Sequence, residues 1–212
     1  MNGLFIALEG PEGAGKSTLA VHLAEVLRRR AAARAGMVLL TREPGGTPVS
    51  DAIRSVLLDP GQQIAPLTEF LLYSASRAQH VEDVIRPALT AGSLVICDRF
   101  TGSSLAYQGA GRGLDAEFVT GLSRRVTGDC VPDVTVLVDI DAEVGLNRIR
   151  SRGDADRLEQ ADTAFHRRVA ESFRAQAAEH DWLTVDGSLP PAEVAERVLS
   201  GLAERLDRWF AS

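Results

Sequence analysis

Short apolar runs alternate with amphipathic stretches along the whole chain. Five runs have the length and the unbroken apolar character of buried strands, and they lie at about residues 4–8, 37–41, 94–97, 134–138 and 182–185. A helical stretch separates each run from the next. Because apolar strands that alternate with helices are typical of parallel sheets covered on both faces, the pattern predicts an α/β fold with right-handed crossovers.

Breakers and caps define the helices between these runs. The first helix is expected over about residues 16–30, and a long one over 67–91, with Pro66 at its start, Gly92 after its end and Pro87 as a candidate kink. Further helices are expected to begin near residues 142 and 161, and a last one to cover about 192–210. Since no internal repeat or low-complexity linker interrupts the pattern, residues 1–212 are expected to form a single domain.

Composition narrows the class of protein. The 212 residues are 45% apolar and 25% charged, which is typical of a globular chain, and no stretch approaches the roughly 20 apolar residues of a membrane helix. The N-terminus lacks the pattern of a secretory signal, and the two cysteines, Cys97 and Cys130, suit neither a disulfide framework nor a zinc cluster, so a cytoplasmic location is expected. A net charge of −6 argues against a general nucleic-acid surface. No membrane or nucleic-acid partner is therefore predicted.

A phosphate-binding motif follows the first apolar run. Residues 10–17 read Gly10-Pro11-Glu12-Gly13-Ala14-Gly15-Lys16-Ser17 and match GxxxxGK[ST] between a strand and a helix. Among 23 basic residues Lys16 is the single lysine, in a chain that otherwise uses arginine. Lys16 is expected to reach the β- and γ-phosphates of ATP, and the Ser17 hydroxyl to bind Mg²⁺. The alternative is an incidental glycine-rich turn.

Other features restrict the kind of P-loop protein. An ordinary GTPase needs an NKxD-type guanine reader, but the chain has only two asparagines, Asn2 and Asn147, and the second is followed by arginine. The chain is also short for a strand-separating motor. A kinase for a small molecule is the class that remains.

A second group of charged residues ends the third apolar run. Asp98 and Arg99 come where the carboxyl ends of the strands of a parallel sheet hold their ligands. Asp98 is a candidate to support Mg²⁺ through water, and Arg99 to bind two phosphate oxygens. The alternative is a structural ion pair.

Four arginines gather in one polar segment between two predicted helices. Arg148, Arg150, Arg152 and Arg157 fall within ten residues that have little to bury. The pattern fits either a solvated helix end or a mobile lid over about residues 148–160 that closes on phosphates.

Three further segments carry a family resemblance. Residues 95–108 (Val-Ile-Cys-Asp-Arg-Phe-Thr-Gly-Ser-Ser-Leu-Ala-Tyr-Gln), 41–47 (Thr-Arg-Glu-Pro-Gly-Gly-Thr) and 71–80 (Leu-Leu-Tyr-Ser-Ala-Ser-Arg-Ala-Gln-His) resemble the motifs of thymidylate kinases, in the same order along the chain. The resemblance implies the three-layer fold of nucleoside monophosphate kinases, with a five-stranded parallel sheet, helices on both faces and an arginine-rich lid. It also implies transfer of phosphate from ATP–Mg²⁺ to dTMP, and a homodimer.

The resemblance assigns roles to individual residues. The implied catalytic residues are Lys16, Arg99 and Arg152. The implied nucleotide-binding residues are Gly10, Pro11, Glu12, Gly13, Ala14, Gly15, Lys16, Ser17, Thr18 and Arg148. The implied substrate-binding residues are Glu12, Glu43, Pro44, Phe70, Ser74, Arg77, Arg99, Ser104, Tyr107 and Gln108. The implied metal-binding residues are Ser17 and Asp98.

Several of these roles follow only from the family. Phe70 is implied to stack on thymine and Arg77 to bind a base carbonyl, although an aromatic residue at helical spacing would otherwise be interpreted as core. Tyr107 is implied to disfavour a ribose 2′-hydroxyl. Because the P-loop holds no basic residue before its lysine, the chain resembles members whose catalytic arginine comes from the lid, and Arg152 is the candidate. Arg148 is expected beside the adenine, and a cis peptide is hypothesised between Glu43 and Pro44.

Two alternatives stay open at this stage. One is a kinase for another pyrimidine nucleotide or for a deoxynucleoside. The other is a nucleotide-sensing P-loop protein without turnover, which would need only the ATP half of the site.

Overall fold

A five-stranded parallel sheet forms the centre of the structure, a computed structural model that describes residues 3–31, 37–153 and 155–211, without the side chain of Arg152. The strand order is β2-β3-β1-β4-β5. The strands are β1 (Leu4–Glu9), β2 (Val38–Arg42), β3 (Leu94–Asp98), β4 (Val134–Asp139) and β5 (Leu183–Asp186). The five predicted strands and the α/β class are thus confirmed.

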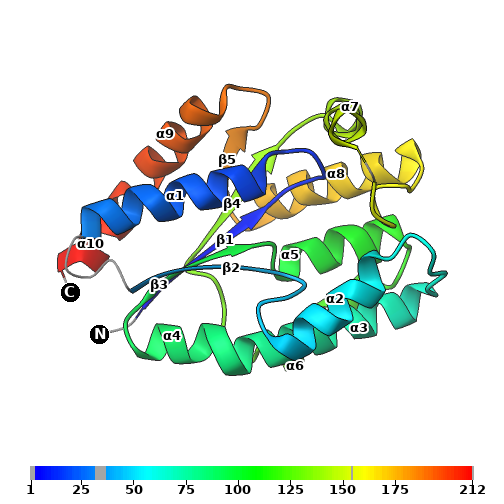
Figure 1. Cartoon of the computed structure of the whole chain (residues 1–212), viewed down its shortest axis with the longest axis horizontal. Coiled ribbons are helices and arrows are strands. Elements are labelled where there is room, and N and C mark those ends of the chain that lie inside the picture. The colour runs from blue at the N-terminus through cyan, green and yellow to red at the C-terminus, as the bar shows by residue number, and fades with distance from the viewer. Residues whose placement is uncertain (1–2, 32–36, 154, 212) are drawn as a thin grey trace.

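Helices cover both faces of the sheet (Figure 1). Leu4, Ile6 and Leu8 of β1 point to the face covered by α1 (Lys16–Ala31), α9 (Pro191–Gly201) and α10 (Ala203–Ala211). Phe5 and Ala7 point to the opposite face. The elements on that side are α3 (Pro66–His80), η2 (Val81–Ile85), α4 (Arg86–Thr90), α5 (Thr101–Ser104), η3 (Leu105–Gly111), α6 (Ala116–Thr127) and α8 (Thr163–Glu179). Because β1 is covered on both faces, all six of its residues are buried.

Two short helices complete the carboxyl-terminal edge of the sheet. Helix α2 (Pro48–Leu58) packs on α3, and α7 (Ala142–Arg152) follows β4. Thr47 caps α2 by accepting a hydrogen bond from the backbone N–H of Ser50, and Asp141 caps α7 in the same way. These caps fix where both helices begin, next to the loops that follow the strands.

The long helix predicted over residues 67–91 is present but contains a π-helical turn. The N–H of Arg86 donates to the carbonyl of Val81, one residue further back than in an α-helix. Pro87 follows directly, and proline has no N–H to continue the ordinary pattern. The helix therefore continues through Pro87 because the π turn η2 precedes it.

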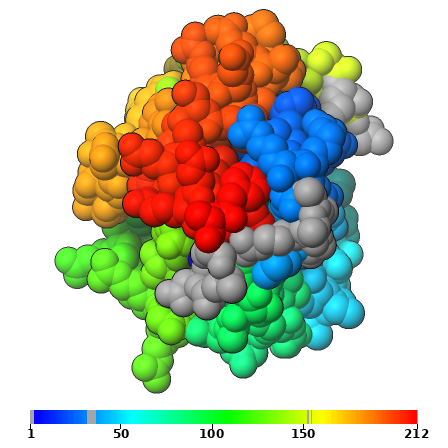
Figure 2. Space-filling model, turned by 90° about the vertical axis from the view of Figure 1, so that its left-hand side faces the viewer, coloured from blue at the N-terminus to red at the C-terminus, as the bar shows by residue number. Residues whose placement is uncertain are grey.

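The expectation of one helix over residues 192–210 is wrong, because the chain divides there into α9 and α10 at Leu202. Gly201 ends α9 where it meets β5, and a Cβ on this residue would lie 2.7 Å from the side chain of Leu183. Figure 2 shows α10, in red, beside α1 and α9. Within the described ranges, no helix is long and apolar enough to cross a bilayer.

Candidate active site

The loops after β1, β2 and β3 meet at one edge of the sheet and enclose a cavity of about 370 Å³. This is where open α/β sheets bind their ligands. The predicted residues that line the cavity are Glu12, Gly13, Gly15, Lys16, Ser17, Thr18, Glu43, Pro44, Arg77, Asp98, Arg99, Ser104, Tyr107, Gln108 and Arg148. Most of the site predicted from the sequence is therefore brought together.

The P-loop connects β1 to α1. Gly13 and Gly15 adopt positive φ angles of 72° and 88°, and a Cβ on Gly13 would lie 2.3 Å from the carbonyl oxygen of Gly145. The Lys16 ammonium is buried and donates to the Pro11 carbonyl at 2.7 Å. Burial and the nearby positive charge of Arg99 lower the pKa of Lys16 to about 8. The negative charge of a bound phosphate would offset both effects, because it favours the charged form of the ammonium.

Ser17 and Asp98 form an oxygen-rich pair beside Lys16. The Ser17 hydroxyl donates to Asp98 Oδ2 at 2.5 Å. The other carboxylate oxygen, Oδ1, is buried and has no hydrogen-bond partner among the described residues. A hydroxyl beside a carboxylate with an unused oxygen suits a hard cation, so this pair fits Mg²⁺.

Arg99 joins the P-loop to the rest of the cavity. It adopts a left-handed φ of 73°, and its guanidinium donates to the Gly10 carbonyl at 3.0 Å and to Glu12 at 2.6 Å. Tyr107 also donates to Glu12, at 3.0 Å, and its ring lies 5.0 Å from the Arg99 guanidinium. Burial raises the pKa of Glu12, but the charges of Arg99 and Lys16 outweigh this and the net pKa is lowered. Glu12 is thus an anion that fixes Arg99 and Tyr107.

Arg77 lies at the opposite side of the cavity, buried on α3. Its guanidinium donates to Glu43 at 2.6 Å, to the Ser104 hydroxyl at 2.9 Å and to the Phe100 carbonyl at 2.9 Å. The loops after β2 and β3 therefore converge on one cation. The peptide between Glu43 and Pro44 is cis, as hypothesised.

Two predicted residues of α3 do not line the cavity. Phe70 is fully buried and packs edge to face on Phe118 of α6. Ser74 is buried too, and its hydroxyl has no hydrogen-bond partner within the described part of the chain. One turn further along, Arg77 does reach the cavity.

The lid arginines separate into different environments. Arg148 donates to the carbonyls of Gly187 at 2.9 Å and Gly13 at 3.3 Å, and it borders a second, largely apolar cavity of about 370 Å³ between α1 and α9. Arg150 is exposed, and the side chain of Arg152 lies outside the described residues. Arg157 does not line the cavity at the P-loop, and it donates to buried Glu69 at 2.5 Å and to the Leu57 carbonyl at 2.7 Å.

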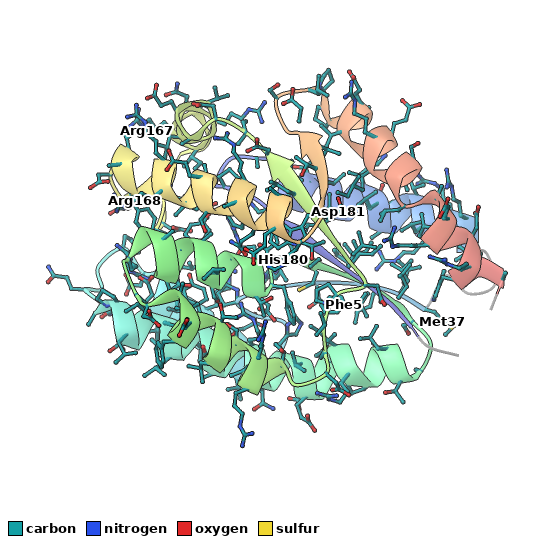
Figure 3. The ribbon with its side chains drawn as sticks, turned by 180° about the vertical axis from the view of Figure 1, so that it is seen from behind. Phe5, Met37, Arg167, Arg168, His180 and Asp181 are labelled. Atoms are coloured by element: carbon teal, nitrogen blue, oxygen red, sulfur yellow. The ribbon has the colours of Figure 1, made fainter. Side chains whose placement is uncertain are left out.

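Helix α7, which carries the first part of the lid, is tied to α8. Arg167 of α8 donates to Glu143 of α7, and Figure 3 shows Arg167 at the end of α8 that lies next to α7. Both side chains are more than half exposed. Because the pair is exposed to solvent, it contributes little to the stability of the contact between α7 and α8.

The sequence analysis missed several residues of the site. The cavity is also lined by Arg42, Arg54, Leu58, Tyr73, Ser103, Ile149, Asp156, Leu158 and Glu159. Glu9 was missed as well: it is fully buried and accepts from the backbone N–H groups of Phe100 and Ser103 at 3.0 Å. The sequence did hold a signal for Glu9, because a charged residue directly follows the unbroken apolar run of β1. The sequence held no such signal for Arg54, because an arginine on an amphipathic helix is usually exposed. In the structure Arg54 donates to the Pro44 carbonyl at 2.9 Å.

The site defines a class of protein by three features in one cavity. These are the P-loop lysine Lys16, the carboxylate of Asp98, which suits Mg²⁺, and a second buried cation, Arg77. The fold and the site are those of a P-loop nucleotide kinase. A family model described as thymidylate kinase matches residues 8–198. The chain belongs to the thymidylate kinase family.

Individual relatives agree over nearly the full length. A thymidylate kinase of Deinococcus radiodurans is 52% identical over 205 residues, 96% of this chain and 98% of that protein. One of Pseudomonas fluorescens (strain Pf-5) is 50% identical over 212 residues, 98% of this chain and 99% of that protein. The crystal structure of thymidylate kinase from Ehrlichia chaffeensis superposes with a TM-score of 0.79 at 31% identity, covering 96% of this chain and 99% of that one.

Proposed function

We propose that this enzyme transfers the γ-phosphoryl group of ATP to dTMP and produces dTDP. The observation that carries the proposal is the contact of Glu12 with Arg99 and Tyr107. It joins the triphosphate loop to the residues of the acceptor side, so both nucleotides would share one cavity. Membership of the thymidylate kinase family supports the same acceptor.

The ATP half is assigned to the P-loop and the lid. The backbone N–H groups of the loop and Lys16 would hold the phosphates, and the apolar cavity beside Arg148 would take the adenine. Ser17 and Asp98 would hold Mg²⁺, which when bound supplies charge compensation for the β- and γ-phosphates.

The acceptor half is assigned to α3 and the segment after β3. Arg77, fixed by Glu43 and Ser104, would bind a carbonyl of the thymine. Phe70 and Ser74 lie on the same helical face as Arg77 but do not line the cavity, so their proposed contact with the ring requires that this wall opens when dTMP binds. The Tyr107 ring would lie against the deoxyribose. The remaining acceptor residues are Pro44 and Gln108, which line the cavity.

The transfer needs charge compensation rather than a base. The phosphate of dTMP is mostly ionised at neutral pH, since its second pKa is about 6, and is already nucleophilic. Its negative charge opposes that of the triphosphate, so the protein must position both groups and offset the repulsion. Lys16, Arg99 and Arg152 are the residues proposed to do this. Closure of the lid over residues 148–160 would exclude water as a competing acceptor.

The role of Arg152 has a direct test. Arg152→Ala is expected to lower kcat by about 10³ or more, the range for a cation that stabilises a transferring phosphoryl group. Steady-state kinetics with ATP and dTMP measure this. Turnover close to that of the unchanged enzyme would refute the assignment of the catalytic arginine to the lid.

An acceptor panel tests the proposed function itself. ADP release is measured with no acceptor and then with dTMP, dUMP, dCMP or thymidine. The proposal predicts that dTMP gives the highest kcat/KM and that dUMP loses about 1 to 3 kcal/mol of transition-state binding, the value of one methyl group in an apolar pocket. A higher kcat/KM for dCMP or thymidine would indicate the alternative kinase, and ATP binding without turnover would indicate a sensor.

We further propose a cytoplasmic homodimer built from single-domain subunits. The buried thiols of Cys97 and Cys130, which form no disulfide, suit a reducing compartment. Exposed apolar side chains gather on the helices α2, α3 and α6, at Val49, Val56, Leu67, Leu71 and Phe118. A second copy of this chain would cover these side chains.

A further inference from the structure

A chain of buried hydrogen bonds lies behind Arg77. His80, the last residue of α3, is 0% exposed and does not line the cavity. Its Nδ1 lies 3.0 Å from Glu43 Oε1, and its Nε2 lies 2.7 Å from the Thr41 hydroxyl. The other oxygen of Glu43 accepts from Arg77 at 2.6 Å. Thr41, His80, Glu43 and Arg77 thus form one continuous relay from β2 to the acceptor pocket.

The chemistry of the groups sets the direction of each hydrogen bond. A carboxylate can only accept, so His80 donates from Nδ1 to Glu43. In the neutral imidazole, Nε2 then accepts a hydrogen bond that the Thr41 hydroxyl donates. Both ring nitrogens are therefore used, and each oxygen of Glu43 has its own donor.

The backbone around His80 is shaped to hold the ring. Gly46 follows the Glu43–Pro44 turn with a positive φ of 91°, and a Cβ on it would lie 2.6 Å from Cδ2 and Nε2 of the imidazole. Only glycine leaves this space. The loop after β2 therefore closes directly on His80 and limits its movement.

A metal site is the competing interpretation of this cluster. Donor atoms of Glu43, His80 and Cys97 lie within 4.8 Å of one another. However, the Cys97 thiol donates to the Arg99 carbonyl at 3.1 Å, and burial raises its pKa well above the ordinary value, whereas a metal binds the thiolate. Both oxygens of Glu43 are also occupied, so the geometry favours the relay.

We propose that His80 and Thr41 are positioning residues that fix the Arg77 guanidinium and thereby set the discrimination between dTMP and dCMP. The inference rests on the proposed contact between Arg77 and a base carbonyl. Cytosine carries an amino group where thymine has one of its carbonyls, and a rigid donor rejects an amino group more strongly than a mobile one. When the relay is broken, Glu43 loses the partner of one of its oxygens, so the carboxylate that accepts from Arg77 is held less firmly. Arg77 keeps its contacts with Ser104 and the Phe100 carbonyl, but its orientation toward the base is less strictly fixed.

Steady-state kinetics of paired variants test the proposal. His80→Leu is expected to raise KM for dTMP about tenfold and to lower the dTMP-to-dCMP ratio of kcat/KM about tenfold, the size expected for hydrogen bonds to charged groups, while kcat and KM for ATP stay within about threefold. His80→Asn, whose amide places a donor near the Nδ1 position, should recover most of this loss. Thr41→Val should lower the ratio, and Thr41→Ser should preserve it.

Two results would overturn the proposal. One is a folded His80→Leu variant with unchanged KM for dTMP and unchanged discrimination. If that variant does not fold, the Thr41 pair decides, and equal ratios in Thr41→Val and Thr41→Ser overturn it. Arg77→Gln separates the failure of this inference from the failure of the proposed function. If Arg77→Gln keeps the discrimination between dTMP and dCMP, Arg77 does not read the base and the proposed function loses that contact. If Arg77→Gln loses the discrimination but the His80 and Thr41 variants keep it, the base contact stands and only the relay is refuted.

Discussion

At the scale of single residues, Lys16 is the most informative position. It is buried at the start of α1, in a chain where every other basic residue is arginine. Arginine is a planar fork, whereas an ammonium is a compact charge that can lose its proton when it is buried. The choice of lysine in an arginine-rich chain was visible in the sequence, but its lowered pKa depends first on burial and then on Arg99, which comes from a distant segment.

The single lysine allows a direct titration. Selective ¹⁵Nζ labelling should give one lysine side-chain signal, with a titration midpoint of about 8 in the enzyme without nucleotide. Because bound phosphate favours the charged form, ATP–Mg²⁺ should move the midpoint upward. In consequence kcat/KM for ATP should fall above pH 8, while kcat should persist to higher pH. A midpoint near 10.5 without nucleotide would contradict the burial of this ammonium.

Other residues of the site could be found from the sequence only through the family motifs. Glu12, Arg77 and Ser104 belong to three separate motifs, and that they line one cavity depends on how β1, α3 and α5 pack. Glu69 was not found, because a glutamate on a helix is usually solvated. It is fully buried and accepts from Gln108 and Arg112, at the end of η3, and from Arg157, in the segment after α7.

At the scale of elements, apolar periodicity predicted all five strands and most helices. It could not predict the π turn η2 or the break between α9 and α10, because these follow from a missing N–H at Pro87 and from close packing of Gly201 on Leu183. The arginines of the lid segment also lie in two different environments, which the composition of the segment could not distinguish. Arg148 borders the apolar cavity, whereas Arg157 anchors the end of the lid to α3.

This anchor predicts a loss of stability on substitution. Arg157→Ala should lower the free energy of unfolding by about 2 kcal/mol, because it removes a charged hydrogen bond to buried Glu69 while Arg112 and Gln108 still donate to that carboxylate. Urea unfolding measures the change. Arg174→Ala is the matched control, since the side chains of its ion pair with Asp139 are 46% and 26% exposed, against 9% and 0% for Arg157 and Glu69, and the pair should be worth less than about 1 kcal/mol. Equal effects of the two substitutions would show that Glu69 does not depend on Arg157.

At the scale of the whole molecule, the exposed apolar side chains of α2, α3 and α6 predict self-association. Sedimentation of the unchanged protein should give a dimer, and Leu71→Glu should shift it toward the monomer, because a charge is then buried at the interface. Val21→Glu is the control: Val21 on α1 is as exposed as Leu71 but lies outside the proposed interface, so its variant should remain dimeric. A monomeric unchanged protein at micromolar concentration would contradict the proposed homodimer.

The measurement that tests the account most directly is a crystal structure with dTMP and a non-hydrolysable ATP analogue bound together. We expect the thymine beside Arg77 and Ser104, the triphosphate on the P-loop at Lys16, and a phosphate oxygen of dTMP about 3 to 3.5 Å from the γ-phosphorus and in line for transfer. A structure in which dTMP binds outside the shared cavity, or with its phosphate turned away from the γ-phosphate, would contradict the account.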